Sequence, residues 1–112
     1  MAKPVTRPYS RYTKTGLTLL AQVIRMERLE RKLTLAELAE RAAVSRGLLQ
    51  RIEQGDPGCA IGAVFEVASI LGIELFNADE ETLNARTAAQ ERMLMLQPRS
   101  ARASRKPVKD DF

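Results

Sequence analysis

Residues 34–55 read TLAELAERAAVSRGLLQRIEQG and carry several helix signals. Thr34 and Glu37 have the spacing of a capping box, which predicts the start of a helix. Apolar side chains then recur at helical spacing and predict one buried stripe, formed by Leu35, Leu38, Ala39 and Ala42. Ala43-Val44 predict a sharp turn, and Ser45 predicts the N-cap of a second helix that runs to Gln54. We therefore expect two short helices joined by a tight turn.

The solvent side of the second helix carries side chains suited to contact with DNA. In this arrangement the first helix crosses the DNA backbone and the second enters the major groove. Arginine pairs with guanine and glutamine with adenine, while Gly47 permits close approach of the backbone. The predicted DNA-binding residues are Ser45, Arg46, Gly47 and Gln50, with Arg51 at the margin of the groove and Thr34 at the start of the first helix.

The same spacing also fits an antiparallel helix pair inside a bundle. In that interpretation Arg46, Gln50 and Arg51 form only a solvated face. Helical spacing by itself favours neither interpretation over the other.

The flanking sequence predicts an all-α fold of five helices. A helix over residues 17–31 precedes the pair, with Leu20 and Ile24 toward the core. A fourth helix over residues 61–71 ends at Gly72, which has the C′ position typical of glycine. Residues 73–76 alternate and predict a short extended segment, and residues 79–96 predict a fifth helix.

Composition divides the chain into one helical domain between two basic ends. We expect a flexible arm over residues 1–15, a domain over residues 16–96 and a flexible tail over residues 97–112. Residues 73–76 are one candidate dimer interface. The fifth helix is predicted to supply core or dimer contacts through Leu83, Ala89, Met93, Leu94 and Leu96.

Charge and residue types favour a binding protein over an enzyme. The 112 residues carry a net charge of +4 and contain no histidine, so the commonest acid–base group and metal ligand is missing. The single cysteine, Cys59, cannot form an internal disulfide or a zinc site and indicates a reducing cytoplasm. We expect no cofactor, no metal, no membrane span and a polyanionic partner such as DNA. A pure protein-interaction adaptor is the competing class.

Residues 33–55 resemble the helix-turn-helix of the XRE, or lambda-repressor and Cro-like, family. The resemblance rests on the Leu-Thr start, the Glu-Leu-Ala core, Val-Ser at the turn and Ile-Glu-x-Gly at the end, and it extends from about Ile24 to Leu75. It implies a lambda-repressor-like domain that represses transcription from a palindromic operator as a homodimer.

Two positions depart from the family pattern. Leu35 stands where the family often has a glutamine that touches phosphate or braces the second helix. Ala43 stands where glycine is common, because the turn uses a left-handed conformation that costs alanine more. Either Ala43 is strained or the turn differs slightly.

A narrower resemblance is to HipB-type antitoxins, carried by Asp56-Pro57-Gly58, the helix containing Phe65, and Leu71-Gly72-Ile73-Glu74-Leu75. It implies a bacterial cytoplasmic protein that regulates its own operon and neutralises a HipA-type serine/threonine kinase toxin. The basic tail ending in Asp-Asp-Phe resembles tails in this group, so Phe112 is the candidate toxin-binding residue. A solitary XRE-family repressor without a toxin is the alternative.

Overall fold

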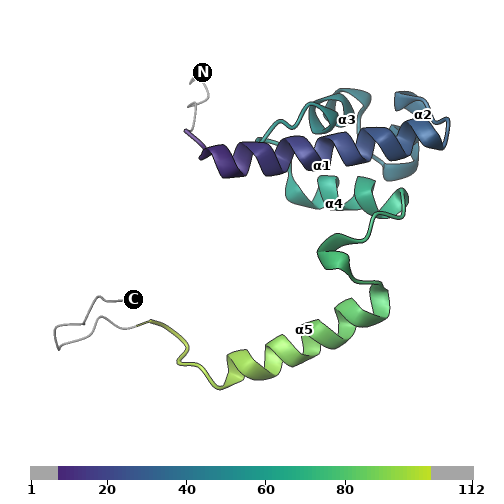
Figure 1. Ribbon diagram of the computed structural model, residues 1–112. Helices are drawn as coiled ribbons and strands as arrows, with labels where there is room; N and C mark the ends of the chain where they lie inside the picture. The colour runs from purple at the N-terminus through teal and green to yellow at the C-terminus, as the bar shows by residue number, and fades with distance from the viewer. Residues whose placement is uncertain (1–7, 102–112) are drawn as a thin grey trace. The chain divides into compact units, whose positions relative to one another are not determined.

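The computed structural model describes residues 8–101, and all regular secondary structure within them is helical (Figure 1). This part of the chain contains no strand. Five α helices and one short 3-10 helix follow one another: α1 Arg11–Glu30, α2 Leu35–Ala42, α3 Arg46–Glu53, α4 Ile61–Ile70, η1 Leu75–Asn77 and α5 Glu80–Met95. The predicted all-α fold of five helices is therefore confirmed. The chain divides after Asn77 into two compact units, one holding α1–α4 and the other α5.

The core of the first unit lies between its four α helices. Helix α2 packs against α3 and α4, and α1 packs against α3. The buried cluster contains Ile24, Leu38, Ala39, Ala42, Leu49, Ile52, Val67 and Leu71. The predicted inward face of residues 34–54 is confirmed, with Leu35 and Leu48 half-buried at its edge. Val67, which the sequence pattern did not single out, is completely buried.

The four helices of the first unit end in the same way, with one residue in the left-handed region. These residues are Lys32, Ala43, Gly55 and Gly72, with φ of 57, 56, 76 and 75°. In each case the next amide reaches back to a carbonyl five residues earlier, as the Val44 N–H does to the Ala39 oxygen at 3.0 Å. This is the Schellman motif, and it confirms the predicted role of Gly72.

Two predicted boundaries were wrong. Helix α1 begins at Arg11, not near residue 17, because the Ser10 hydroxyl caps it by accepting from the Thr13 amide at 3.2 Å. Residues 11–15, expected in the arm, therefore lie in α1. Residues 1–7 and 102–112, which include Phe112, lie outside the described residues.

The predicted extended segment over residues 73–76 is also wrong. The chain there turns through η1, where Phe76 and Asn77 have φ of 59 and 54°. Two successive positive φ values are incompatible with a strand. The Phe76 ring meets Phe65 edge-on, with ring centres 6.5 Å apart.

Helix α5 begins as predicted but buries none of its side chains. Asp79 caps it by accepting from the Thr82 amide at 2.8 Å, and Glu80 and Glu81 follow in the first turn. Met93, Leu94 and Leu96 are 58, 62 and 79% exposed, so they supply no core contacts within this chain, and the predicted dimer contacts of α5 stay a prediction. The helix has apolar residues on several sides and thus no single stripe to bury.

Within residues 8–101, no helix combines the length and the apolar character needed to cross a membrane.

Candidate nucleic-acid interface

Helix α3 is set in place by its cap and by its apolar side. The Ser45 hydroxyl accepts from the Leu48 amide at 3.0 Å, which confirms Ser45 as the N-cap. Leu49 and Ile52 are buried in the core and hold the opposite side of α3 outward. The tight turn before it is closed by Ala43, whose φ and ψ of 56 and 41° are left-handed.

The exposed side of α3 is centred on Gly47 and Gln50. At 100° per residue, these two positions and Gln54 lie along one line, with Arg46 and Arg51 on either side of it. All five are exposed. Gln54 was not among the predicted contacts, although its position one turn after Gln50 could have indicated it. The predicted residues of α3 therefore do share one accessible face.

The first turn of α3 offers unused hydrogen-bond donors. Arg46 is exposed, and no hydrogen bond or ion pair engages its side chain anywhere in residues 8–101. A Cβ built on Gly47 meets nothing within 4 Å, so the packing of this chain does not require glycine there. Backbone amides at the positive end of a helix are suited to bind phosphate. A side-chain-free, exposed position at this point permits a close approach by an anionic backbone.

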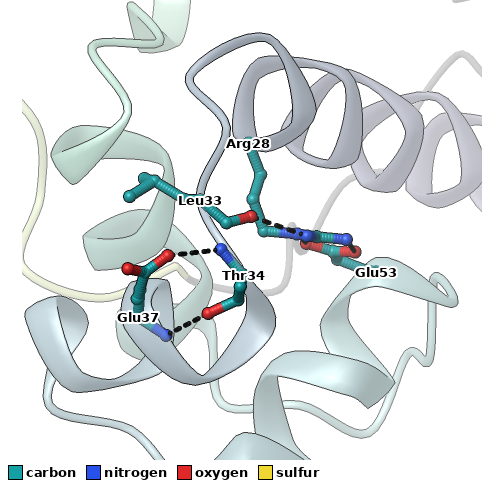
Figure 2. A network of polar contacts seen from close by, with 5 residues as sticks. All are labelled: Arg28, Leu33, Thr34, Glu37 and Glu53. Atoms are coloured by element: carbon teal, nitrogen blue, oxygen red, sulfur yellow. Dashed lines mark hydrogen bonds and ion pairs between the residues drawn. The ribbon is translucent and has the colours of Figure 1, made fainter.

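The far end of α3 is anchored by an ion pair that sequence reasoning missed. Arg28 of α1 donates from Nε to Glu53 Oε2 at 2.7 Å and from Nη2 to Oε1 at 3.0 Å (Figure 2). Its Nη1 also donates to the Leu33 carbonyl at 2.9 Å. Arg28 is only 8% exposed. The pair therefore fixes α3 to α1 and to the start of α2 on the side away from solvent.

Thr34 is occupied by the capping box of α2. Its hydroxyl accepts from the Glu37 amide at 3.0 Å, and its own N–H donates to Glu37 Oε1 at 2.8 Å (Figure 2). The hydrogen bond from the Thr34 backbone, and after it a hydrogen bond from the Thr34 side chain, hold the pKa of Glu37 below its ordinary value. Both polar groups of Thr34 are thus engaged with Glu37, and the predicted contact of Thr34 with DNA stays a prediction.

Arg51 holds the loop that follows α3. Its Nε donates to Asp56 Oδ2 at 2.9 Å, while the Gly58 amide donates to Asp56 Oδ1 at 2.8 Å. The hydrogen bond from the Gly58 amide, and after it the one from Arg51, lower the pKa of Asp56. The hydrogen bond between Arg51 and Asp56 also raises the pKa of Arg51. Arg51 is still half exposed, so the rest of its guanidinium faces solvent.

Residues 19–80 match a family model described as a helix-turn-helix domain, and the match covers more than half of the chain. The chain belongs to the helix-turn-helix domain family. Comparison with curated proteins and with solved structures found no significant match. The match spans α2, the turn and α3, so the helix pair that spacing alone could not assign is a DNA-binding motif of the XRE-like kind.

Both departures from the XRE pattern have a structural outcome in this helix-turn-helix domain. Leu35 packs against the core, so the position supplies burial and no polar group for phosphate. Ala43 adopts the left-handed conformation itself, at a cost of about 1–2 kcal/mol relative to glycine. The turn thus uses the left-handed conformation that glycine would adopt without strain.

Cys59 lies half-buried beside the helix-turn-helix, at the edge of the core. Burial raises the pKa of its thiol, the reverse of what a reactive thiolate needs. Among the described residues, no group of three or more Cys, Asp or Glu side chains is arranged to hold a metal ion.

Proposed function

We propose that this protein is a sequence-specific transcriptional repressor that binds a palindromic operator as a homodimer. The observation that carries the proposal is the exposed face of α3, where Arg46, Gly47 and Gln50 lie together at the solvent side of a helix-turn-helix. The net charge of +4 favours association with a polyanion.

Each part of that face has a defined task in the proposal. Arg46 donates to O6 and N7 of a guanine, and Gln50 pairs with an adenine one helical turn further along. Gly47 and the first amides of α3 lie against the phosphate backbone, and the Ser45 hydroxyl proton adds a contact there. Arg28–Glu53 keeps α3 at a fixed angle, which base recognition requires.

Operator selection from random duplexes, followed by Arg46→Ala, tests the proposal. If Arg46 reads a guanine, the variant binds about 1–3 kcal/mol more weakly and loses preference at one base pair. Arg92→Ala is the matched control, since Arg92 is an exposed arginine of α5, outside the helix-turn-helix, and this variant should bind the operator as the wild type does. Equal losses on all sequences would make Arg46 a phosphate contact, and no selected sequence at all would refute the proposed function.

We further propose that the repressor is the antitoxin of a HipBA-like toxin–antitoxin module. The support is the resemblance of residues 56–75 to HipB-type antitoxins and the tail that ends at Phe112. In this proposal the protein represses its own operon and neutralises a HipA-type kinase, with Phe112 in contact with the toxin. A solitary repressor is the alternative.

Pull-down with the tagged full chain separates these two functions. Recovery of a HipA-type kinase supports the antitoxin, and its absence from cells that encode such a kinase supports the solitary repressor. Deletion of residues 110–112 should weaken toxin binding while operator binding is retained. Unchanged toxin binding would remove Phe112 from the interface.

A further inference from the structure

Helix α1 has two apolar sides that point in opposite directions. Its inner side buries Ala21, Ile24 and Arg28 in the first unit. Its outer side leaves five large apolar side chains in solvent: Tyr12, Leu19, Val23, Met26 and Leu29 are 89, 60, 37, 58 and 51% exposed. A surface helix that packs on one core needs only one apolar stripe. A second, contiguous apolar stripe on the opposite side of the helix marks an interaction surface.

The outer stripe has the spacing of a helix-pairing seam. Tyr12, Leu19 and Met26 stand seven residues apart, and so do Gly16 and Val23 in the adjacent row. A seven-residue repeat keeps one seam in contact with a second helix over several turns. The stripe also borders a shallow hollow lined by Gln22, Arg25, Met26 and Leu29, which gives a partner side chain a place to pack.

We propose that this outer side of α1 is a homodimer interface, where α1 pairs antiparallel with α1 of a second copy about a two-fold axis. The inference deepens the proposed function and rests on it, because a palindromic operator is read by two copies related by such an axis. A two-fold interface uses the same patch on both copies, so the patch must be complementary to itself.

The shape of the stripe meets that condition. Gly16 lies between Tyr12 and Leu19 in its first half, and an added Cβ there meets nothing within 4 Å, so the helix surface is notched at that one position. Its second half carries the bulky side chains of Val23, Met26 and Leu29. Antiparallel pairing sets the Gly16 notch of each helix against the bulky side chains in the second half of the other. Parallel pairing would set notch against notch.

The charges of α1 favour the same arrangement. Its first turn contains no acidic residue and carries Arg11, with Lys14 one turn on, at the end where the helix dipole is already positive. The opposite end carries Glu30 together with the cations Arg25 and Lys32, while Arg31 is paired there with Glu27 at 3.5 Å. Arg11, Lys14 and Glu30 are exposed and, within residues 8–101, without an ion pair. Antiparallel pairing sets Arg11 of each helix beside Glu30 and the negative dipole end of its partner, whereas parallel pairing would set Arg11 against Arg11 and Glu30 against Glu30.

The interface is compatible with DNA binding. Helix α3 packs against the inner side of α1, so pairing through the outer side covers no part of the Arg46, Gly47 and Gln50 face. Each copy therefore presents its helix-turn-helix while the two copies remain joined.

Sedimentation equilibrium of the full chain tests the interface. The wild type should have twice the 12.5 kDa mass of one chain. Leu19→Glu/Met26→Glu places four like charges in the paired seam and should give the mass of one chain with an unchanged circular dichroism spectrum. Leu19→Ala/Met26→Ala, which keeps good helix formers, should weaken the dimer without a new charge. Leu94→Glu/Met95→Glu, at similarly exposed apolar residues of α5, is the control and should remain dimeric.

Three outcomes would overturn the interface: a monomeric wild type, a dimeric Leu19→Glu/Met26→Glu variant, or dissociation caused only by the α5 substitutions.

A DNA-binding measurement distinguishes failure of the α1 interface from failure of the proposed repressor function. The wild type should prefer a palindromic duplex over a half-site duplex by about 10²-fold or more, and the α1 variant should lose this preference while keeping half-site binding. A wild type that dimerises through α1 but binds no DNA would leave the interface intact and refute the repressor.

Discussion

Arg28 and Glu53 form a two-pronged ion pair, with Nε–Oε2 and Nη2–Oε1 distances of 2.7 and 3.0 Å, between α1 and the last residue of α3. Their side chains are only 10 and 7% exposed. The pair joins the helix that carries the outer apolar stripe to the helix proposed to contact DNA. It is thus the polar link between the two surfaces on which the proposals rest.

Breaking this pair should destabilise the domain strongly. Glu53→Ala leaves the Arg28 charge buried without its carboxylate, which should lower the free energy of unfolding by about 3–5 kcal/mol. Chemical denaturation monitored by circular dichroism measures the change. Glu27→Ala is the control, because its pair with Arg31 is long, at 3.5 Å, and exposed, so a loss of about 0–1 kcal/mol is expected. Equal losses in the two variants would contradict a buried, structural role for Arg28–Glu53.

Ala43→Gly should stabilise the domain. Glycine adopts the φ of 56° at this turn without strain. Glycine also gives the unfolded chain more conformational entropy, which offsets part of this effect, so the free energy of unfolding should rise by about 0.5–1 kcal/mol. Thermal unfolding measures it. The matched control is Ala36→Gly, at an exposed helical position of α2, which should cost about 1 kcal/mol. If both substitutions destabilise equally, Ala43 is not strained.

Gly47→Ala should separate DNA binding from stability. The added methyl group meets nothing within 4 Å and improves helix propensity, so stability should rise by up to about 1 kcal/mol. Operator affinity should nevertheless fall, because the methyl group occupies the space through which DNA approaches. Gly62→Ala is matched closely, since Gly62 is also the second residue of its helix with open space around it. That variant should gain stability and bind the operator as the wild type does; unchanged affinity in Gly47→Ala would show that DNA does not approach there.

The loop after α3 should loosen only in strong acid. The pKa of Asp56 is lowered from its ordinary value of 3.8 by the Gly58 and Arg51 hydrogen bonds. The stabilisation is therefore complete above that ordinary value and disappears as pH falls through the lowered pKa. The NMR shift of the Gly58 amide should titrate below 3.8, and in Asp56→Asn this titration should vanish. A midpoint at or above the ordinary value would mean that the Arg51–Asp56 contact does not persist in solution.

Local features of this protein could be predicted from sequence because each involves neighbours a few residues apart. The Thr34–Glu37 capping box, the Ser45 cap and the Gly72 helix end are all of this kind. The buried side of α3 also followed from helical period. The extended segment at 73–76 was wrong because alternation over four residues is too short to distinguish a strand from a turn.

The helix-turn-helix and the side of α3 that faces solvent followed from the order of the residues, since capping and helical period act within a few residues. The packed fold was needed to show which charged side chains are engaged and which are free. Arg28 and Arg51 look like ordinary surface cations in sequence, yet Arg28 is buried against Glu53, 25 residues away, and Arg51 holds Asp56, while Arg46 stays free. It also decided that α1 exposes a second apolar side, because only the packed core shows which stripe of a two-sided helix remains uncovered.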